Sequence, residues 1–123
     1  MNYSPMPSTW LITGALALTG TLLAGQACAM SLRELQALEM TNQQGENHAN
    51  YYLIGVMEGA LEAHLHVARN GAKAVVCPKG RDLEPSMARN LYDAERQRHA
   101  DVYEADMPVP LVMTNALKQA YPC

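Results

Sequence analysis

Apolar residues recur every three or four positions in four segments of this sequence, which is the spacing of one face of an α-helix. The clearest pattern covers residues 49–69 and is followed by the stop signal Asn70-Gly71. Its apolar positions are Leu53, Ile54, Met57, Ala60, Leu61, Leu65 and Ala68. Its opposite side carries Glu58, Glu62, His66 and Arg69. The segment therefore predicts an amphipathic helix with one solvated face, on which Glu62 and His66 form a weak i,i+4 pair.

A shorter helix precedes this one. The sequence Ser31-Leu32-Arg33-Glu34 is a capping box, in which the Ser31 hydroxyl and the Glu34 carboxylate satisfy free amides of the first turn. Leu32, Leu35 and Leu38 follow at helical spacing, and the polar segment 41–47 is expected to end the helix.

Two further helices are predicted in the second half of the chain. One runs from about Leu83 to Glu104, with Asp82 as its cap and Pro85 in its first turn. The other opens at Pro110. It is expected to bury Val112, Met113, Ala116, Leu117 and Ala120. The predicted fold class is all-α, a small four-helix bundle-like domain without strands.

The N-terminal segment has the features of a signal peptide. Residues 10–24 (WLITGALALTGTLLA) form an uncharged apolar run that is short for a membrane-spanning helix. Ala27-Cys28-Ala29 then supplies the small-x-small pattern that signal peptidase accepts. We expect cleavage after Ala29, which makes residues 1–29 the signal peptide and residues 30–123 one mature domain. The alternatives are an uncleaved anchor and lipoprotein processing at Cys28, although Gly25-Gln26-Ala27 lacks the large aliphatic residue that lipoprotein signals carry.

Cleavage would leave two cysteines, Cys77 and Cys123, the second of which ends the chain. An even pair of cysteines in an exported chain predicts a disulfide bond. Such a bond would hold the last helix to the middle of the chain. Two free thiols, or a bond between two chains through Cys123, are the alternatives.

The remaining composition disfavours several function classes. The formal net charge is −3 and no basic stripe with interleaved aromatic residues occurs, so we expect no nucleic-acid partner. The mature chain offers no nucleophile beside a base, so we expect no catalytic residues and no enzyme activity. Glu58, Glu62 and His66 share one helical face but fall short of a metal-ligand set, and we expect no metal or other cofactor.

Small residues form a ridge on the second predicted helix, at Gly55, Gly59 and Ala63. A ridge of this kind allows another backbone to approach closely. That backbone could belong to a neighbouring helix, to a second copy of the protein in a homodimer, or to a partner. A binding protein therefore fits the sequence better than an enzyme.

Three segments carry a resemblance to a known family. They are YYLIGVMEGAL (residues 51–61), Cys77-Pro78 and NALKQAYPC (residues 115–123). Together they resemble the Rap/Tai family, small periplasmic immunity proteins that protect bacteria from peptidoglycan amidase effectors of type VI secretion. The resemblance covers nearly all of the mature chain, and it too implies a disulfide between Cys77 and Cys123. The chain departs from the family in its Lys79-Gly80 loop and in its charged third helix.

The resemblance implies a function in the periplasm. The protein would bind a secreted cell-wall hydrolase and occlude its active site, with no turnover of its own and no membrane contact after signal cleavage. Two surfaces are candidates for this contact. The first is the loop of residues 71–82, with Lys79, Arg81 and Asp82. The second is the polar helix face of Glu58, Glu62, His66 and Arg69. The alternative function is a periplasmic acid-stress chaperone, whose four histidines would gain charge as the pH falls.

Overall fold

The computed structural model describes residues 28–123, and these residues form four helices. The predicted signal peptide lies almost wholly outside the described residues. The helices are α1 (Leu32–Glu39), α2 (Gln43–Arg69), α3 (Met87–Arg98) and α4 (Val109–Ala120). Within the described part, extended pairing is limited to two isolated bridges, Ser31 with Pro108 and Val76 with Pro122. The predicted all-α fold is confirmed. No helix in residues 28–123 is long and apolar enough to cross a membrane.

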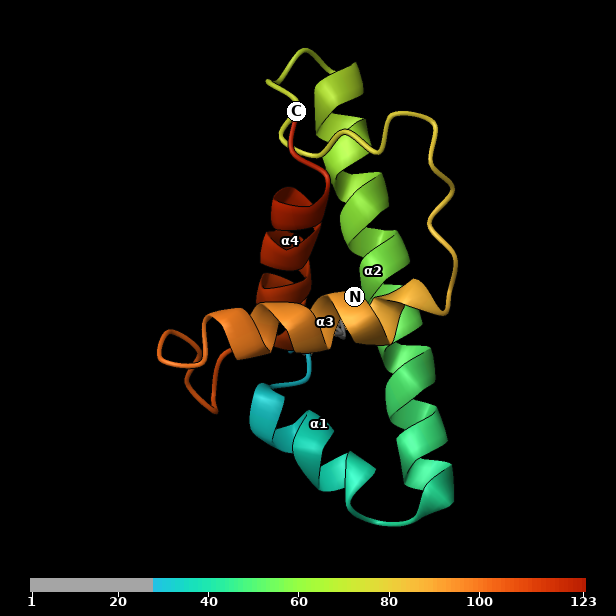
Figure 1. Ribbon diagram of the computed structural model, residues 1–123, viewed down its shortest axis with the longest axis vertical. Helices are drawn as coiled ribbons and strands as arrows, with labels where there is room; N and C mark the ends of the chain where they lie inside the picture. The colour runs from blue at the N-terminus through green and yellow to red at the C-terminus, as the bar shows by residue number, and fades with distance from the viewer. Residues whose placement is uncertain (1–27) are drawn as a thin grey trace, which may run out of the picture.

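The long helix α2 is the scaffold of the fold (Figure 1). Helix α4 lies along one part of α2, α3 crosses both of them, and α1 packs at the N-terminal end of α2. The largest fully buried side chains come from all four helices. They are Leu35, Leu53, Met57, Tyr92, Val109, Val112, Met113 and Leu117. The core therefore lies where α1, α3 and α4 meet the N-terminal half of α2.

Of the apolar face predicted for α2, Leu53 and Met57 are fully buried and Ile54 is half-buried. Farther along, Leu61 and Leu65 are half-buried. The reason is length: α2 has 27 residues and α4 has 12. At 1.5 Å per residue, α2 extends about 20 Å beyond what α4 can cover.

The first helix ends before the polar segment 41–47, as predicted, but the second helix begins at Gln43 and not at about Ala49. Asn42 caps the helix by accepting a hydrogen bond from the Gly45 amide at 2.9 Å. Gly45 is buried against the end of α1, and a Cβ atom there would lie 2.2 Å from the Leu38 carbonyl oxygen. Gly45 is therefore needed for the close approach of α1 and α2, and it lies inside α2 rather than at the end of a helix.

The third helix is shorter than predicted, and it runs from Met87 to Arg98 instead of from about Leu83 to Glu104. Pro85 precedes the helix, and Asp82 lies too far upstream to cap it. At the other end His99 terminates α3. The chain then turns back, and its carbonyl groups at Ala105 and Met107 accept hydrogen bonds from the first amides of α1. Residues 105–107 are thus used to cap α1, and the chain after His99 does not extend α3.

The capping box at Ser31 and Glu34 is confirmed. The Ser31 hydroxyl accepts a hydrogen bond from the Glu34 amide, and the Glu34 carboxylate accepts one from the Ser31 amide. These contacts lower the pKa of Glu34, chiefly through the hydrogen bond from the Ser31 backbone. The first turn of α1 therefore has partners for its free amides from both the box and residues 105–107.

Candidate functional site

The predicted bond between Cys77 and Cys123 is present, with a Cα–Cα distance of 4.9 Å. It joins the connection between α2 and α3 to the end of the chain. The Cys77 amide also donates a hydrogen bond to the Tyr121 carbonyl at 2.8 Å. Val76, beside it, is buried and pairs with Pro122. The connection is therefore fixed at its middle by one covalent bond and by backbone contacts.

The residues that follow the disulfide form an exposed turn. Lys79 has a φ of 53° and Gly80 a φ of 74°, so both adopt the left-handed conformation. This conformation is uncommon for a lysine. Lys79, Arg81 and Asp82 are all exposed, as expected for a contact surface. The Arg81 amide donates to the Pro78 carbonyl at 3.1 Å, which closes the turn.

A cavity of about 130 Å³ lies beneath this turn. Its walls are the disulfide-linked connection, through Cys77, Pro78, Lys79 and Arg81, and the chain end at residues 120–122. We call residues 77–82 the disulfide loop. It presents two cations, Lys79 and Arg81, on a backbone that is held in place on one side.

The second predicted surface, on α2, is solvated as expected. Glu58, Glu62, His66 and Arg69 are all exposed. The expected pair between Glu62 and His66 is not formed. Glu62 pairs with Arg69 instead, and the His66 ring lies 3.0 Å from the Asn70 side-chain nitrogen. In the described residues, neither a hydrogen bond nor an ion pair links this face to the disulfide loop, so they are two separate surfaces.

The small-residue ridge on α2 has no neighbour within the described chain. A Cβ atom added at Gly55 or Gly59 would meet nothing within 4 Å. Ala63 is exposed as well. Among residues 28–123, a neighbouring helix is therefore excluded as the backbone that packs on the ridge, and the homodimer and the partner stay predictions.

Sequence reasoning missed a buried carboxylate on α3. Glu95 is only 3% exposed, although it lies in a strongly charged segment. Its Oε1 atom accepts a hydrogen bond from the Tyr103 hydroxyl at 2.7 Å and lies 3.0 Å from Nδ1 of His99. Asn115 of α4 donates to the same Tyr103 hydroxyl at 3.0 Å. The cluster thus joins the end of α3, the segment after it and α4.

The Glu95 cluster lines a cavity of about 340 Å³. Burial, and then the hydrogen bond to Glu95, raise the pKa of the Tyr103 hydroxyl. Tyr103 is therefore neutral and a hydrogen-bond donor at physiological pH. The residues lining this cavity include no serine, threonine or cysteine. The arrangement satisfies its own polar atoms and serves to hold residues 99–103 against α4.

A second polar junction joins α1, α2 and α3 through Arg89. Its guanidinium donates to Glu39 of α1 at 2.5 Å and to Asn50 of α2 at 2.8 Å. Asp93 lies farther away, 3.8 Å from the same group. Burial raises the pKa of Asp93 and outweighs the opposing effect of Arg89. Neither junction brings together three or more residues of the kinds that bind metal ions, in the part of the chain that the structure describes.

Comparisons of the chain with protein-family models, curated proteins and solved structures found no match.

Proposed function

We propose that this protein is an exported immunity protein that binds a peptidoglycan amidase effector of type VI secretion and occludes its active site. The proposal starts from the resemblance of residues 51–61, 77–78 and 115–123 to the Rap/Tai family. The structural observation that supports it most is the disulfide loop, an exposed and cationic turn anchored by Cys77–Cys123. A disulfide of this kind fits the oxidising conditions of the periplasm.

A fixed loop is well suited to inhibition. Ordering a flexible segment on binding consumes part of the interaction free energy, and a loop that is already ordered avoids this loss. The disulfide loop is held at Cys77 by the bond to Cys123 and by the Tyr121 carbonyl. Its exposed cations can pair with carboxylates at the mouth of a hydrolase cleft. Binding of this type blocks the substrate without chemistry on the inhibitor.

The test is inhibition of purified amidase effectors. Each exported peptidoglycan amidase from the same genome is mixed with increasing amounts of the protein, and release of soluble peptidoglycan fragments is measured. We expect one amidase to lose its activity at an equimolar ratio. If every amidase keeps full activity in the presence of excess folded protein, the proposed function is wrong.

A charge reversal in the loop then tests the contact surface. Arg81→Glu is expected to weaken inhibition by tenfold or more, roughly the effect of replacing an interfacial attraction by repulsion. Lys73→Glu is the matched control, because Lys73 is also exposed and lies in the same connection but outside the disulfide loop. Equal inhibition by both variants and the wild type would exclude the disulfide loop as the contact while leaving the immunity function standing.

A further inference from the structure

Arg96 of α3 has no carboxylate partner among residues 28–123. No ion pair within 4.0 Å reaches its guanidinium there, and residues 1–27 contain no Asp or Glu. Its neighbours on the helix differ in this respect. Arg89 pairs with Glu39, and Arg98 lies 3.5 Å from Glu95. Burial raises the pKa of the Tyr92 hydroxyl, and the charge of Arg96 and its hydrogen bond to that hydroxyl oppose this effect.

The guanidinium of Arg96 rests on an aromatic ring that cannot move far. Its central carbon lies 5.7 Å from the centroid of the Tyr92 ring, within the range of a cation–π contact. Tyr92 is 1% exposed and packed in the core. A contact of this kind is weak at an exposed site, so the ring favours one position of the guanidinium.

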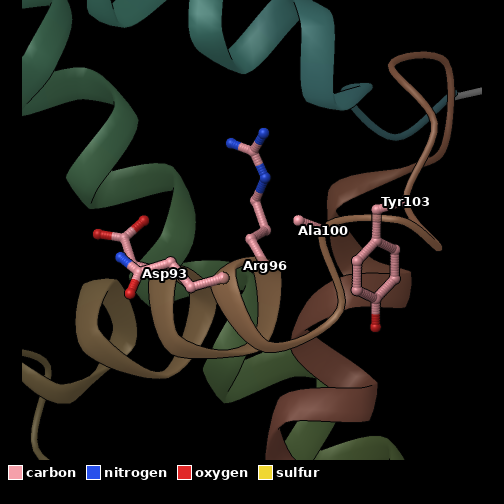
Figure 2. Close-up of a pocket in the computed structure, with 5 residues that line it drawn as sticks. Asp93, Arg96, Ala100 and Tyr103 are labelled. Atoms are coloured by element: carbon pink, nitrogen blue, oxygen red, sulfur yellow. The ribbon is translucent and has the colours of Figure 1, made fainter.

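Arg96 lines a cavity of about 280 Å³, together with Asp93, Gln97, Ala100 and Tyr103. Figure 2 shows Arg96 extending from α3 toward α1, with Asp93 to one side and Ala100 and Tyr103 to the other. The lining of the cavity thus includes a cation that is in no ion pair within the described chain. Helix α3 begins at the connection from α2 and ends on the opposite side of the molecule (Figure 1).

Asp93 is the carboxylate in the lining of this cavity, and it sets the direction from which an anion can approach. It lies on the side of Arg89, whose guanidinium is 3.8 Å away. An incoming carboxylate would be repelled from that side and directed to the side of Ala100 and Tyr103. There the Gln97 amide, which also lines the cavity, is available as a second donor.

We propose that the Arg96 cavity binds a carboxylate from an acidic side chain of a protein partner. The planar fork of a guanidinium matches a carboxylate, and arginine is enriched among the residues that dominate protein–protein binding. The site does not depend on the disulfide loop or on the identity of the partner. The Arg96 cavity on α3 would be a second contact surface for a protein partner, separate from the disulfide loop.

Nuclear magnetic resonance of the arginine side chains tests this directly. The Nε–H signals of the ¹⁵N-labelled protein are followed during titration with sodium acetate, with sodium chloride at equal ionic strength and with methyl phosphate. The signal of Arg96 is assigned by its loss in Arg96→Lys. We expect a saturable shift of the Arg96 signal with acetate and a much smaller one with chloride. Asp93→Asn should strengthen acetate binding about threefold, because it removes the repelling charge.

Two short peptides then test whether a protein side chain is the source of the carboxylate. The acetylated and amidated peptide Gly-Glu-Gly should shift the Arg96 signal, and the otherwise identical Gly-Gln-Gly should not. Arg81 is the internal control, because it is exposed and has no ion pair in the described chain. Equal responses of Arg81 and Arg96 would overturn the proposal. So would a preference for methyl phosphate over acetate, or a failure of Gly-Glu-Gly to act where acetate does.

Discussion

Removing the disulfide is the perturbation whose size can be worked out most directly. The double variant Cys77→Ser/Cys123→Ser opens a covalent loop between residues that are 46 positions apart. In the chain-entropy description, opening a loop of this length lowers the free energy of unfolding by about 4 kcal/mol at 25 °C. Small domains have total unfolding free energies of about 5–15 kcal/mol. The bond is therefore a large part of the stability of this fold.

The contacts around the bond reduce the expected loss. The Cys77 amide still donates to the Tyr121 carbonyl in the variant, and Val76 still has a buried site beside Pro122. The buried face of α4, with Val112, Met113 and Leu117, does not depend on the sulfur atoms. We expect the double variant to lose about 2–4 kcal/mol. For a domain of this length, that corresponds to a fall in melting temperature of about 10–25 °C.

Urea unfolding followed by far-ultraviolet circular dichroism measures this loss. The wild type is unfolded under oxidising conditions and again after reduction and alkylation, and the double variant is unfolded beside them. The reduced wild type and the double variant should share a lowered midpoint. Oxidised wild type and double variant with equal midpoints would refute the reasoning, because the bond would then contribute nothing to the folded state.

Three further predictions concern single side chains and pH. Glu62→Ala should change the free energy of unfolding by less than about 0.5 kcal/mol in thermal melts, because the Glu62–Arg69 pair is exposed on both sides; a larger loss would contradict a solvated face. Burial raises the pKa of Asp93, so its ionised form destabilises the fold at pH 7, and that effect disappears as the pH falls below the ordinary value of 3.8. Asp93→Asn should therefore keep or raise the urea midpoint at pH 7 and match the wild type at low pH, whereas a lower midpoint at pH 7 would contradict this. Under mildly acidic conditions the protein should keep its near-ultraviolet tyrosine signal and bind no apolar dye, while loss of that signal with retained helix and strong dye binding would favour the acid-stress chaperone.

The elements that the sequence predicted well are those whose signals are local. The capping box placed the start of α1, and Pro110 placed the start of α4 within one residue. Four of the five apolar residues expected to be buried in α4 are buried, with Ala120 exposed at the helix end. In each case the residues that decide the structure lie within a turn or two of one another.

The errors occurred where a residue's role depends on a distant segment. The second helix was predicted to start at residue 49 and not at Gln43, and nothing local reveals that the end of α1 leaves no room for a side chain at Gly45. The apolar stripe of α2 predicted burial along its whole length, and it is fully buried only where other helices reach it. The spacing of apolar residues predicts which face of a helix is apolar. The lengths of the helices packed against it determine how much of that face is buried.

Helix α3 shows the same limit for charged residues. A pattern of apolar residues counts every charge as exposed, yet Glu95 is buried because Tyr103 and Asn115 come to it from later segments. Arg89 is used in a similar way to join α1 and α2. Two of the charges that make this helix so polar are therefore accounted for by the fold. Arg96 is not, because the described chain supplies the Tyr92 ring and hydroxyl beside its guanidinium but no carboxylate for its charge. An acceptor from outside the chain would complete it, and the acetate titration is the measurement that decides whether one binds there.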